Sequence, residues 1–167
     1  ENNKGLNLPS PFVKVLPPKP KKRTKASIQT KRKSFRVDDY QKLISACDND
    51  TLKYLIPLSA YTGCRIDELC ALKIETVFSD KIEITDAKTE AGWRTVPIHP
   101  HITQTVTRLV DMSEDGYLVS GLTYNKYGNR SNAIRKRFGR LKKRLGYGPD
   151  YVFHSLRKGF ATQLENA

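Results

Sequence analysis

The spacing of apolar residues changes twice along this chain, and this change restricts the fold more than any other feature. From residue 38 to 72, and again after residue 100, apolar residues recur every three or four positions, which is typical of helices. Between residues 75 and 98 the period falls to two, because Ile82 and Ile84 alternate with polar neighbours and a Val96-Pro97-Ile98 run follows a turn. The pattern predicts an α+β fold, a mainly helical core with one small antiparallel β-sheet.

Helical spacing also marks the individual helices. It predicts them near residues 38–47, 52–62, 65–72, 102–110, 134–145 and 153–165. Gly63 is expected to end the second helix, because glycine readily adopts the left-handed conformation found at helix C-termini. In the fifth helix, Ile134, Phe138, Leu141 and Leu145 share one side and predict a buried face. The length from residue 35 to 167 suits one domain with one core.

The charge of the chain indicates a nucleic-acid partner. Lys and Arg total 30 against 17 Asp and Glu, a formal net charge of +13, and such an excess attracts polyanions. Residues 1–36 hold eleven Lys and Arg and a single acid, Glu1. Prolines such as Pro17 and Pro18 interrupt this run, so residues 1–34 are predicted to form an extended basic linker or arm.

A second basic run, from residue 125 to 145, contains no acid. A helix that stabilises its own surface would place Glu or Asp four residues from its Lys and Arg. Without such acids the like charges repel one another unless phosphates supply the counter-charge; a solvated helix face is the alternative interpretation. We favour contact with the DNA backbone, through Lys126, Arg130, Arg135, Lys136, Arg137, Arg140 and Lys143.

Other classes of protein are disfavoured by the same sequence. No apolar run approaches the length of a membrane span, and the chain starts without the apolar stretch of a secretory signal, so we expect a cytoplasmic protein without membrane contact. Cys47, Cys64 and Cys70 are odd in number and lack metal-ligand spacing, which predicts reduced, partly buried thiols. We expect neither a metal nor a cofactor.

Two short motifs point to a phosphate site. The first is Thr62-Gly63-Cys64-Arg65, continued by Ile66-Asp67-Glu68-Leu69, and the second is His154-Ser155-Leu156-Arg157. The guanidinium groups of Arg65 and Arg157 could both bind one phosphodiester. Because His154 and Arg157 are three positions apart, they share one face of a helix.

Each candidate also has a purely structural interpretation. Arg65 could form a buried ion pair with Asp67 or Glu68. Lys88, which lies between the two motifs in the β segment, could be an exposed charge of a hairpin. His154 could cap a helix or form a hydrogen bond in the core, as histidines commonly do.

The order of these residues resembles the tyrosine recombinases of the phage-integrase family, over most of residues 35–167. Gly63, Arg65, Glu68 and Leu69 match the family's Gly-x-Arg-x-x-Glu-Leu segment. Lys88 matches the lysine of the following hairpin, with Arg94-Thr95-Val96-Pro97-Ile98 as the strand after the turn. His154 and Arg157, with Phe160-Ala161-Thr162 downstream, match the His-x-Leu-Arg motif.

The resemblance implies site-specific DNA recombination or integration, as in prophages and other mobile elements, without a metal. A tyrosine attacks a phosphodiester of double-stranded DNA and leaves a 3′-phosphotyrosine and a 5′-hydroxyl. Arg65 and Arg157 would neutralise the phosphoryl oxygens. Lys88 would protonate the leaving 5′-oxygen, and His154 would bind the phosphate or move a proton. Glu68 would orient an arginine or its helix.

One departure from the family concerns the nucleophile. The family places its tyrosine, and a further His or Trp, beyond the second arginine, whereas all eight tyrosines here precede Arg157. We therefore expect a C-terminally incomplete catalytic domain that is inactive alone, without the preceding DNA-clamping domain, from a recombinase that acts as a homotetramer on paired sites. A catalytically inactive DNA-binding regulator with the same fold, and a basic RNA-binding protein, are the alternatives.

Overall fold

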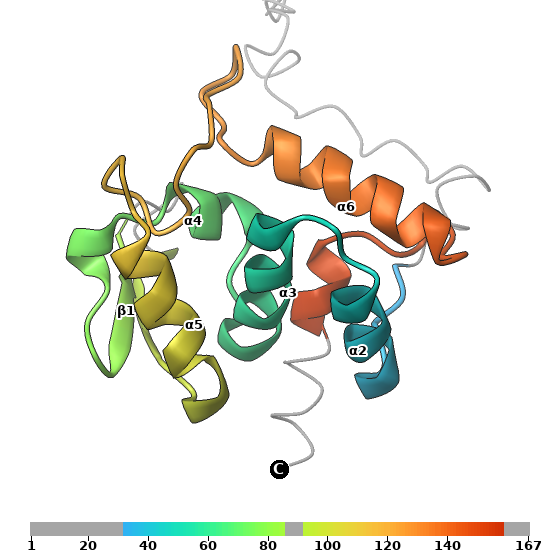
Figure 1. Ribbon diagram of the computed structural model, residues 1–167, viewed down its shortest axis with the longest axis horizontal. Coiled ribbons are helices and arrows are strands. Elements are labelled where there is room, and N and C mark those ends of the chain that lie inside the picture. Colours follow the sequence, from blue (N-terminus) through green and yellow to red (C-terminus); the bar gives the residue numbers. More distant parts are fainter. Residues whose placement is uncertain (1–31, 86–91, 159–167) are drawn as a thin grey trace, which may run out of the picture. The chain divides into compact units, whose positions relative to one another are not determined.

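The computed structural model describes residues 32–85 and 92–158 (Figure 1). Its elements in chain order are the helices α2 (Val37–Ser45), α3 (Asp50–Thr62) and α4 (Ile66–Ala71), the 3-10 helix η1 (Ile74–Thr76), the strands β1 (Lys81–Ile84) and β2 (Arg94–Pro97), and the helices α5 (Pro100–Asp111) and α6 (Asn132–Arg144). Residues 154–158 are also helical. These elements confirm the predicted α+β fold, although the rest of the helix expected over 153–165 lies outside the described residues. Within the described ranges no helix is both long and apolar enough to cross a membrane.

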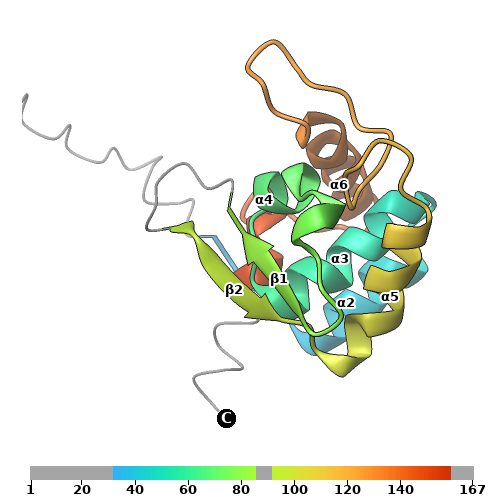
Figure 2. The ribbon, with the colours of Figure 1, turned by 90° about the vertical axis from the view of Figure 1, so that its left-hand side faces the viewer.

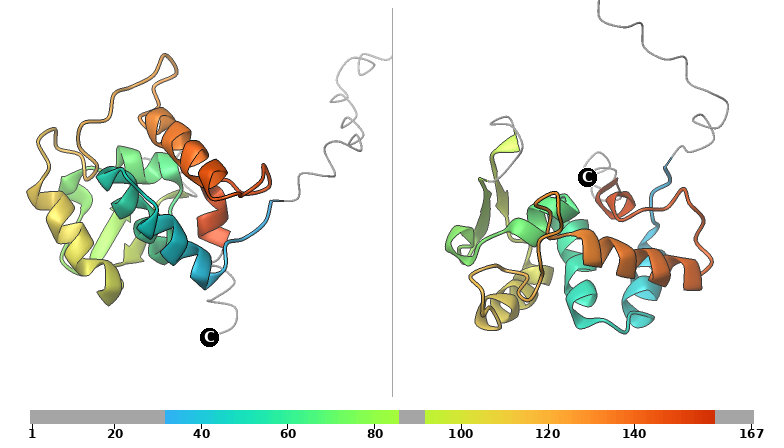
Figure 3. Two further views of the ribbon diagram at one scale, coloured as in Figure 1. Left: turned by 45° about the vertical axis from the view of Figure 1, so that its right-hand side comes forward. Right: turned by 90° about the horizontal axis from the view of Figure 1, so that it is seen from above.

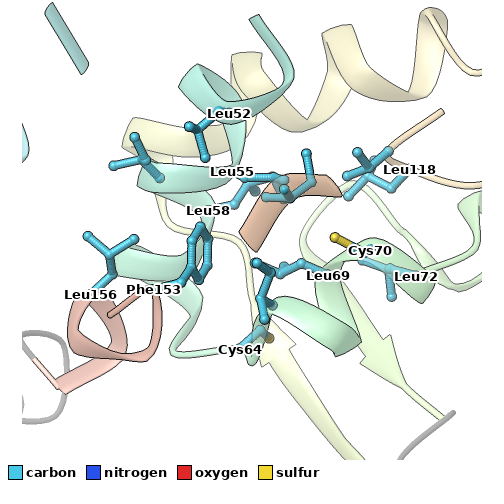
Figure 4. Close-up of a cluster of buried hydrophobic side chains, with 14 of the residues drawn as sticks. Leu52, Leu55, Leu58, Cys64, Leu69, Cys70, Leu72, Leu118, Phe153 and Leu156 are labelled. Atoms are coloured by element: carbon cyan, nitrogen blue, oxygen red, sulfur yellow. The ribbon is translucent and has the colours of Figure 1, made fainter. Parts of the chain in front are cut away.

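Helix α3 contacts α2, α4, α5 and α6. Its leucines and isoleucine at positions 52, 55, 56 and 58 are at most 1% exposed, so this helix is buried on several sides. Figure 4 shows part of the core, in which side chains of α3 and α4 meet Leu156 of the last helical segment and Phe153 just before it. The three cysteines are free and buried, as predicted. The hydrophobic core therefore fixes residues 154–158 relative to α3 and α4.

A tight turn joins α3 to α4. Gly63 adopts a left-handed conformation with a φ of 61°, and its amide donates to the Ser59 carbonyl at 3.2 Å, so it ends α3 as predicted. The Thr62 hydroxyl donates to the Leu58 carbonyl at 2.5 Å and accepts from the Cys64 amide at 3.2 Å. These bonds turn the chain so that the next residue starts α4.

Strands β1 and β2 form a two-stranded antiparallel sheet (Figure 2), in which Ile82 pairs with Val96 and Ile84 with Arg94. Ile82, Ile84 and Val96 are all buried. Side chains two positions apart on a strand share a face, so Arg94 lies on the buried face of β2. The predicted turn around Lys88 falls within residues 86–91, outside the described residues.

Helix α6 packs beside residues 154–158 (Figure 3), where the rings of Phe138 and Phe153 meet edge to face with centroids 5.2 Å apart. Ile134, Phe138 and Leu141 form its buried face, as the sequence predicted, and Leu145 packs against the core just beyond its end. The N-terminal end of α6 is tied to α4, because the Ser131 hydroxyl donates to the Asp67 carboxylate. The basic side chains of α6 occupy its remaining faces.

Candidate functional site

Arg65 is the N-cap residue of α4, directly after the turn at Gly63. Its side chain is 54% exposed, and its Nη1 donates to Oε1 of Glu68 at 2.7 Å. The structural interpretation, a buried ion pair with Asp67 or Glu68, is therefore correct for the partner Glu68, but the pair is buried on the Glu68 side alone and the guanidinium still faces solvent. The other guanidinium nitrogens of Arg65 make no hydrogen bond within residues 32–85 and 92–158. They can bind an external anion.

Glu68 is the buried anchor of this site, with a side chain only 5% exposed. Its carboxylate accepts from the Arg65 amide at 2.8 Å, from Nη1 of Arg65, and from Nη2 and Nη1 of Arg94 at 2.7 Å and 3.3 Å. Burial alone would raise the pKa of Glu68, but the hydrogen bonds from Arg94 and Arg65 outweigh it and lower the pKa from 4.5 to about 2. Glu68 therefore stays ionised and orients arginines instead of transferring protons.

The depressed pKa of Glu68 predicts a specific acid sensitivity. A carboxylate with a lower pKa in the folded state contributes stability that is complete above its unfolded pKa of about 4.5 and is lost as the pH falls towards 2. When the pH is lowered from about 6 to about 3, we expect the free energy of unfolding of Glu68→Gln to fall by about 2 kcal/mol less than that of the wild type. Urea unfolding at the two pH values measures this difference.

The matched control is Glu75→Gln, because the Glu75 side chain is 70% exposed and, among the described residues, forms an ion pair with Lys73 alone. This variant should lose as much stability as the wild type over the same pH interval. An equal loss in Glu68→Gln and the wild type would show that Glu68 does not carry the acid-sensitive contribution.

His154 is exposed and Arg157 is half-buried in the last helical segment, next to the buried Phe153 and Leu156. The segment is held in place by hydrogen bonds as well as by the core. The Tyr40 hydroxyl donates to the Leu156 carbonyl at 2.7 Å, and the Val152 amide donates to the Ser155 hydroxyl at 3.1 Å. His154 and Arg157 thus stand on a rigid support, as a preorganised site requires.

The electrostatics of His154 show which charges gather around it. Its pKa is lowered from 6.5, first because it is partly buried and then because of the positive charges of Arg157, Arg32, Arg65 and Lys158. Residues about 90 positions apart in the sequence are thereby brought within electrostatic reach of one imidazole. A neutral imidazole among cations can donate or accept a hydrogen bond, and a bound anion would offset the surrounding charge.

A pocket of about 390 Å³ opens between α4, α6 and the last helical segment. Arg65 and His154 line it together with three further basic residues, Arg32, Arg135 and Lys142. Asp67 is the one acid among the described residues of the lining, and it already accepts a hydrogen bond from Arg135 at 2.5 Å. The pocket therefore keeps a positive charge that suits an anionic ligand.

The basic residues assigned to DNA contact mostly lie at the surface. Lys126, Arg135, Lys136, Arg140 and Lys143 are exposed and Arg137 is half-buried. Lys136, Arg137, Arg140 and Lys143 form no ion pair in the part of the chain that the structure describes. Their uncompensated charges lie along the faces of α6 that point away from its buried residues.

Arg130 lies apart from this surface. Its side chain is 4% exposed and pairs with Asp115 at 2.9 Å, and its guanidinium donates to the Val119 carbonyl and stacks over the Tyr117 ring at 3.5 Å. These contacts give Arg130 a role in the loop before α6. We leave it out of the proposed DNA-contacting set.

Three basic residues of the site were not singled out from the sequence: Arg94, Arg32 and Lys142. The alternation of β2 could have revealed Arg94, because it stands two positions before the apolar Val96 and therefore on the buried face. Arg32 was hidden within the basic arm, and Lys142 within the basic run of α6. Lys88, which the sequence did single out, lies outside the described residues.

Known proteins resemble this chain in sequence and in fold. Residues 33–167 match the profile of the phage integrase family. The tyrosine recombinase XerA of Pyrococcus furiosus is 32% identical over 143 residues, which cover 81% of this chain and 49% of that protein. The chain thus spans about half the length of the curated relatives it matches.

Two solved structures illustrate the likeness in fold. The crystal structure of XerA recombinase has a TM-score of 0.62 and 25% identity, over 80% of this chain and 50% of that chain. A lambda integrase tetramer bound to a Holliday junction has a TM-score of 0.64 and 20% identity, over 81% of this chain and 43% of that chain. At that identity the second match concerns the fold alone.

Proposed function

Since this chain belongs to the phage integrase family, the tyrosine recombinases, we propose that it carries the phosphate-activating residues of a site that cleaves and rejoins double-stranded DNA in site-specific recombination. In the proposed reaction a tyrosine oxygen attacks the phosphorus of a phosphodiester and forms a 3′-phosphotyrosine bond. The 5′-oxygen leaves and takes up a proton. Attack by the 5′-hydroxyl of another strand reverses the step and rejoins the DNA.

The observation that carries this proposal is the pocket that Arg65 and His154 line together from two distant segments, with Arg157 within electrostatic reach of His154. During phosphoryl transfer, negative charge develops on the non-bridging oxygens. Preorganised guanidinium groups stabilise that charge, and each is expected to accelerate the reaction by about two to three orders of magnitude. Arg65 and Arg157 have this role in the proposed mechanism.

His154 and Lys88 are the proposed proton-transfer residues. The lowered pKa of His154 favours its neutral form, so the imidazole can accept the proton of the attacking hydroxyl or donate a hydrogen bond to the phosphate. Lys88 is proposed as the general acid for the leaving 5′-oxygen, on the strength of its sequence context. Glu68 orients Arg65.

We propose that none of the tyrosines of this chain is the nucleophile. Among the described residues that line the pocket there is no tyrosine. The Tyr40 hydroxyl donates a hydrogen bond to the Leu156 carbonyl, and the Tyr147 hydroxyl donates one to the Asp39 carboxylate. Burial is the largest cause that raises the pKa of each tyrosine to about 12. A hydroxyl that is hard to ionise and already hydrogen-bonded is a poor nucleophile. The chain alone should therefore form no covalent adduct with DNA.

Strand cleavage by an added nucleophile tests this function. The chain is incubated with a library of nicked duplexes of randomised sequence, with a chelator present, and hydrogen peroxide is supplied as a small nucleophile. Without peroxide we expect binding and no protein–DNA adduct; with peroxide we expect strand cleavage above the protein-free background. Binding without cleavage under both conditions would instead favour the inactive regulator, and preference for single-stranded RNA would favour the RNA-binding alternative.

The assembly is a further part of the proposal. We infer that the whole protein acts as a homotetramer on paired duplex sites, and the solved lambda integrase tetramer on a Holliday junction, which has the same fold, supports this inference. Closed symmetric oligomers are the common form for proteins that act on symmetric DNA sites.

A further inference from the structure

The carboxylate of Glu68 is shared unequally between two arginines. Arg94 donates to both of its oxygens, with Nη2 to Oε2 at 2.7 Å and Nη1 to Oε1 at 3.3 Å. The Arg65 guanidinium donates through Nη1 alone, at 2.7 Å. Arg94 is also the more enclosed of the two, since its side chain is 32% exposed against 54% for Arg65.

Arg94 is itself fixed by contacts on two sides. Its Nη1 donates to the Gly92 carbonyl at 3.1 Å, and its Nη2 donates to Sγ of Cys64 at 3.5 Å. Its hydrogen bonds with Glu68 raise the pKa of Arg94 further, so it stays charged. Cys64 is the residue before Arg65, and Glu68 lies one turn after it. Arg94 therefore contacts the chain on both sides of Arg65, through Cys64 in the turn and Glu68 in α4.

A buried carboxylate needs charged donors, because an unpaired buried charge is strongly destabilising. The guanidinium fork fits a carboxylate best when two nitrogens donate in parallel. With Arg94 in this role, Arg65 uses one nitrogen on Glu68 and keeps the others for a ligand. Without Arg94, Arg65 would be the one cation hydrogen-bonded to Glu68 in the described part of the chain, and a two-nitrogen pair between them would become the favoured arrangement.

We propose that Arg94 is a positioning residue of the phosphate site, which occupies Glu68 bidentately and thereby leaves the Arg65 guanidinium available to the phosphate. Arg94 does not line the pocket within the described residues, so it acts through Glu68 and Arg65. The inference rests on the proposed role of Arg65 in binding phosphate. It adds β2 to the elements that determine the strength of that binding.

The test is a double-mutant cycle in which the affinity for sulfate is measured. Sulfate, a tetrahedral oxyanion, is titrated into the chain while the backbone-amide NMR resonance of residue 65 is followed, because this signal exists in every variant. Arg94→Met removes the fork and keeps a side chain of similar length, and we expect sulfate to bind about tenfold more weakly. In Arg94→Met combined with Glu68→Gln, the neutral amide no longer captures Arg65. We expect this pair to restore the affinity to within about threefold of the wild type.

Restoration by a second substitution is not expected from general damage to the fold. Unchanged sulfate affinity in Arg94→Met, or a double variant as weak as Arg94→Met, would overturn the proposal. If Arg94→Met does not fold, Arg94→Lys replaces it, because lysine keeps the charge without the fork. The same weakening and the same restoration are then expected, and their absence would count against the proposal.

One further variant separates this inference from the proposed function. If Arg65→Ala binds sulfate as tightly as the wild type, the phosphate site itself is wrong. If Arg65→Ala weakens binding but Arg94→Met does not, the phosphate site stands and only the positioning role of Arg94 fails.

Discussion

Replacing Arg65 or Arg157 with alanine is expected to reduce peroxide-dependent strand cleavage by at least about a hundredfold each, because each substitution removes a guanidinium from the developing charge of the transition state. Affinity for duplex DNA should change much less, by about threefold or less, since many phosphate contacts contribute to binding. Cleavage is followed on a sequencing gel under single-turnover conditions, and binding is measured on the same duplexes.

Arg108→Ala is the matched control for both variants. Arg108 lies in the last turn of α5 and is exposed. Its guanidinium carbon lies over the Tyr54 ring, 5.9 Å from the ring centroid. Its loss removes the same charge without touching the pocket, so cleavage should stay near the wild-type rate. Equal losses in Arg108→Ala and Arg65→Ala would mean that net charge, and not the arrangement around His154, supports cleavage.

The fold was predictable because its elements have strong local signals. Ile134, Phe138 and Leu141 recur at helical spacing, and the structure buries all three on one face of α6. Gly63 was predicted to end α3, and its left-handed backbone does so. These features depend on neighbours within one turn, which a sequence displays directly.

The site was predictable only in part, because charged side chains are placed by partners that are distant in the sequence. Arg130 was assigned to the surface, yet Asp115 and the Tyr117 ring enclose it. Arg94 was treated as part of a strand, yet it pairs with Glu68, 26 positions away. Neither pair of residues follows a regular spacing along the sequence. The order of the motifs predicted the candidate residues, and only the tertiary structure showed which arginine faces solvent.

Neutralising the free charges of α6 is expected to weaken DNA binding more than any other surface change. The set to replace with glutamine consists of the basic α6 residues without an ion pair in the described structure, which are Lys136, Arg137, Arg140 and Lys143. If each contacts one phosphate, the slope of log K against log salt becomes shallower by about 3 to 4. Affinity at low salt should fall by about two to three orders of magnitude. Fluorescence anisotropy with a labelled duplex over a salt series measures both.

A control set with the same change in charge separates α6 from the general attraction of a basic protein. Lys42 of α2, Lys53 of α3, Lys73 just before η1 and Arg108 of α5 are all exposed. Replacing them with glutamine should leave most of the slope in place. The reason is that counterions are released only where phosphates sit against the side chains, whereas the long-range field is screened within about 10 Å at moderate salt. If the α6 set leaves the slope as steep as the control set does, α6 is a solvated surface, and the DNA must lie against another face of the molecule.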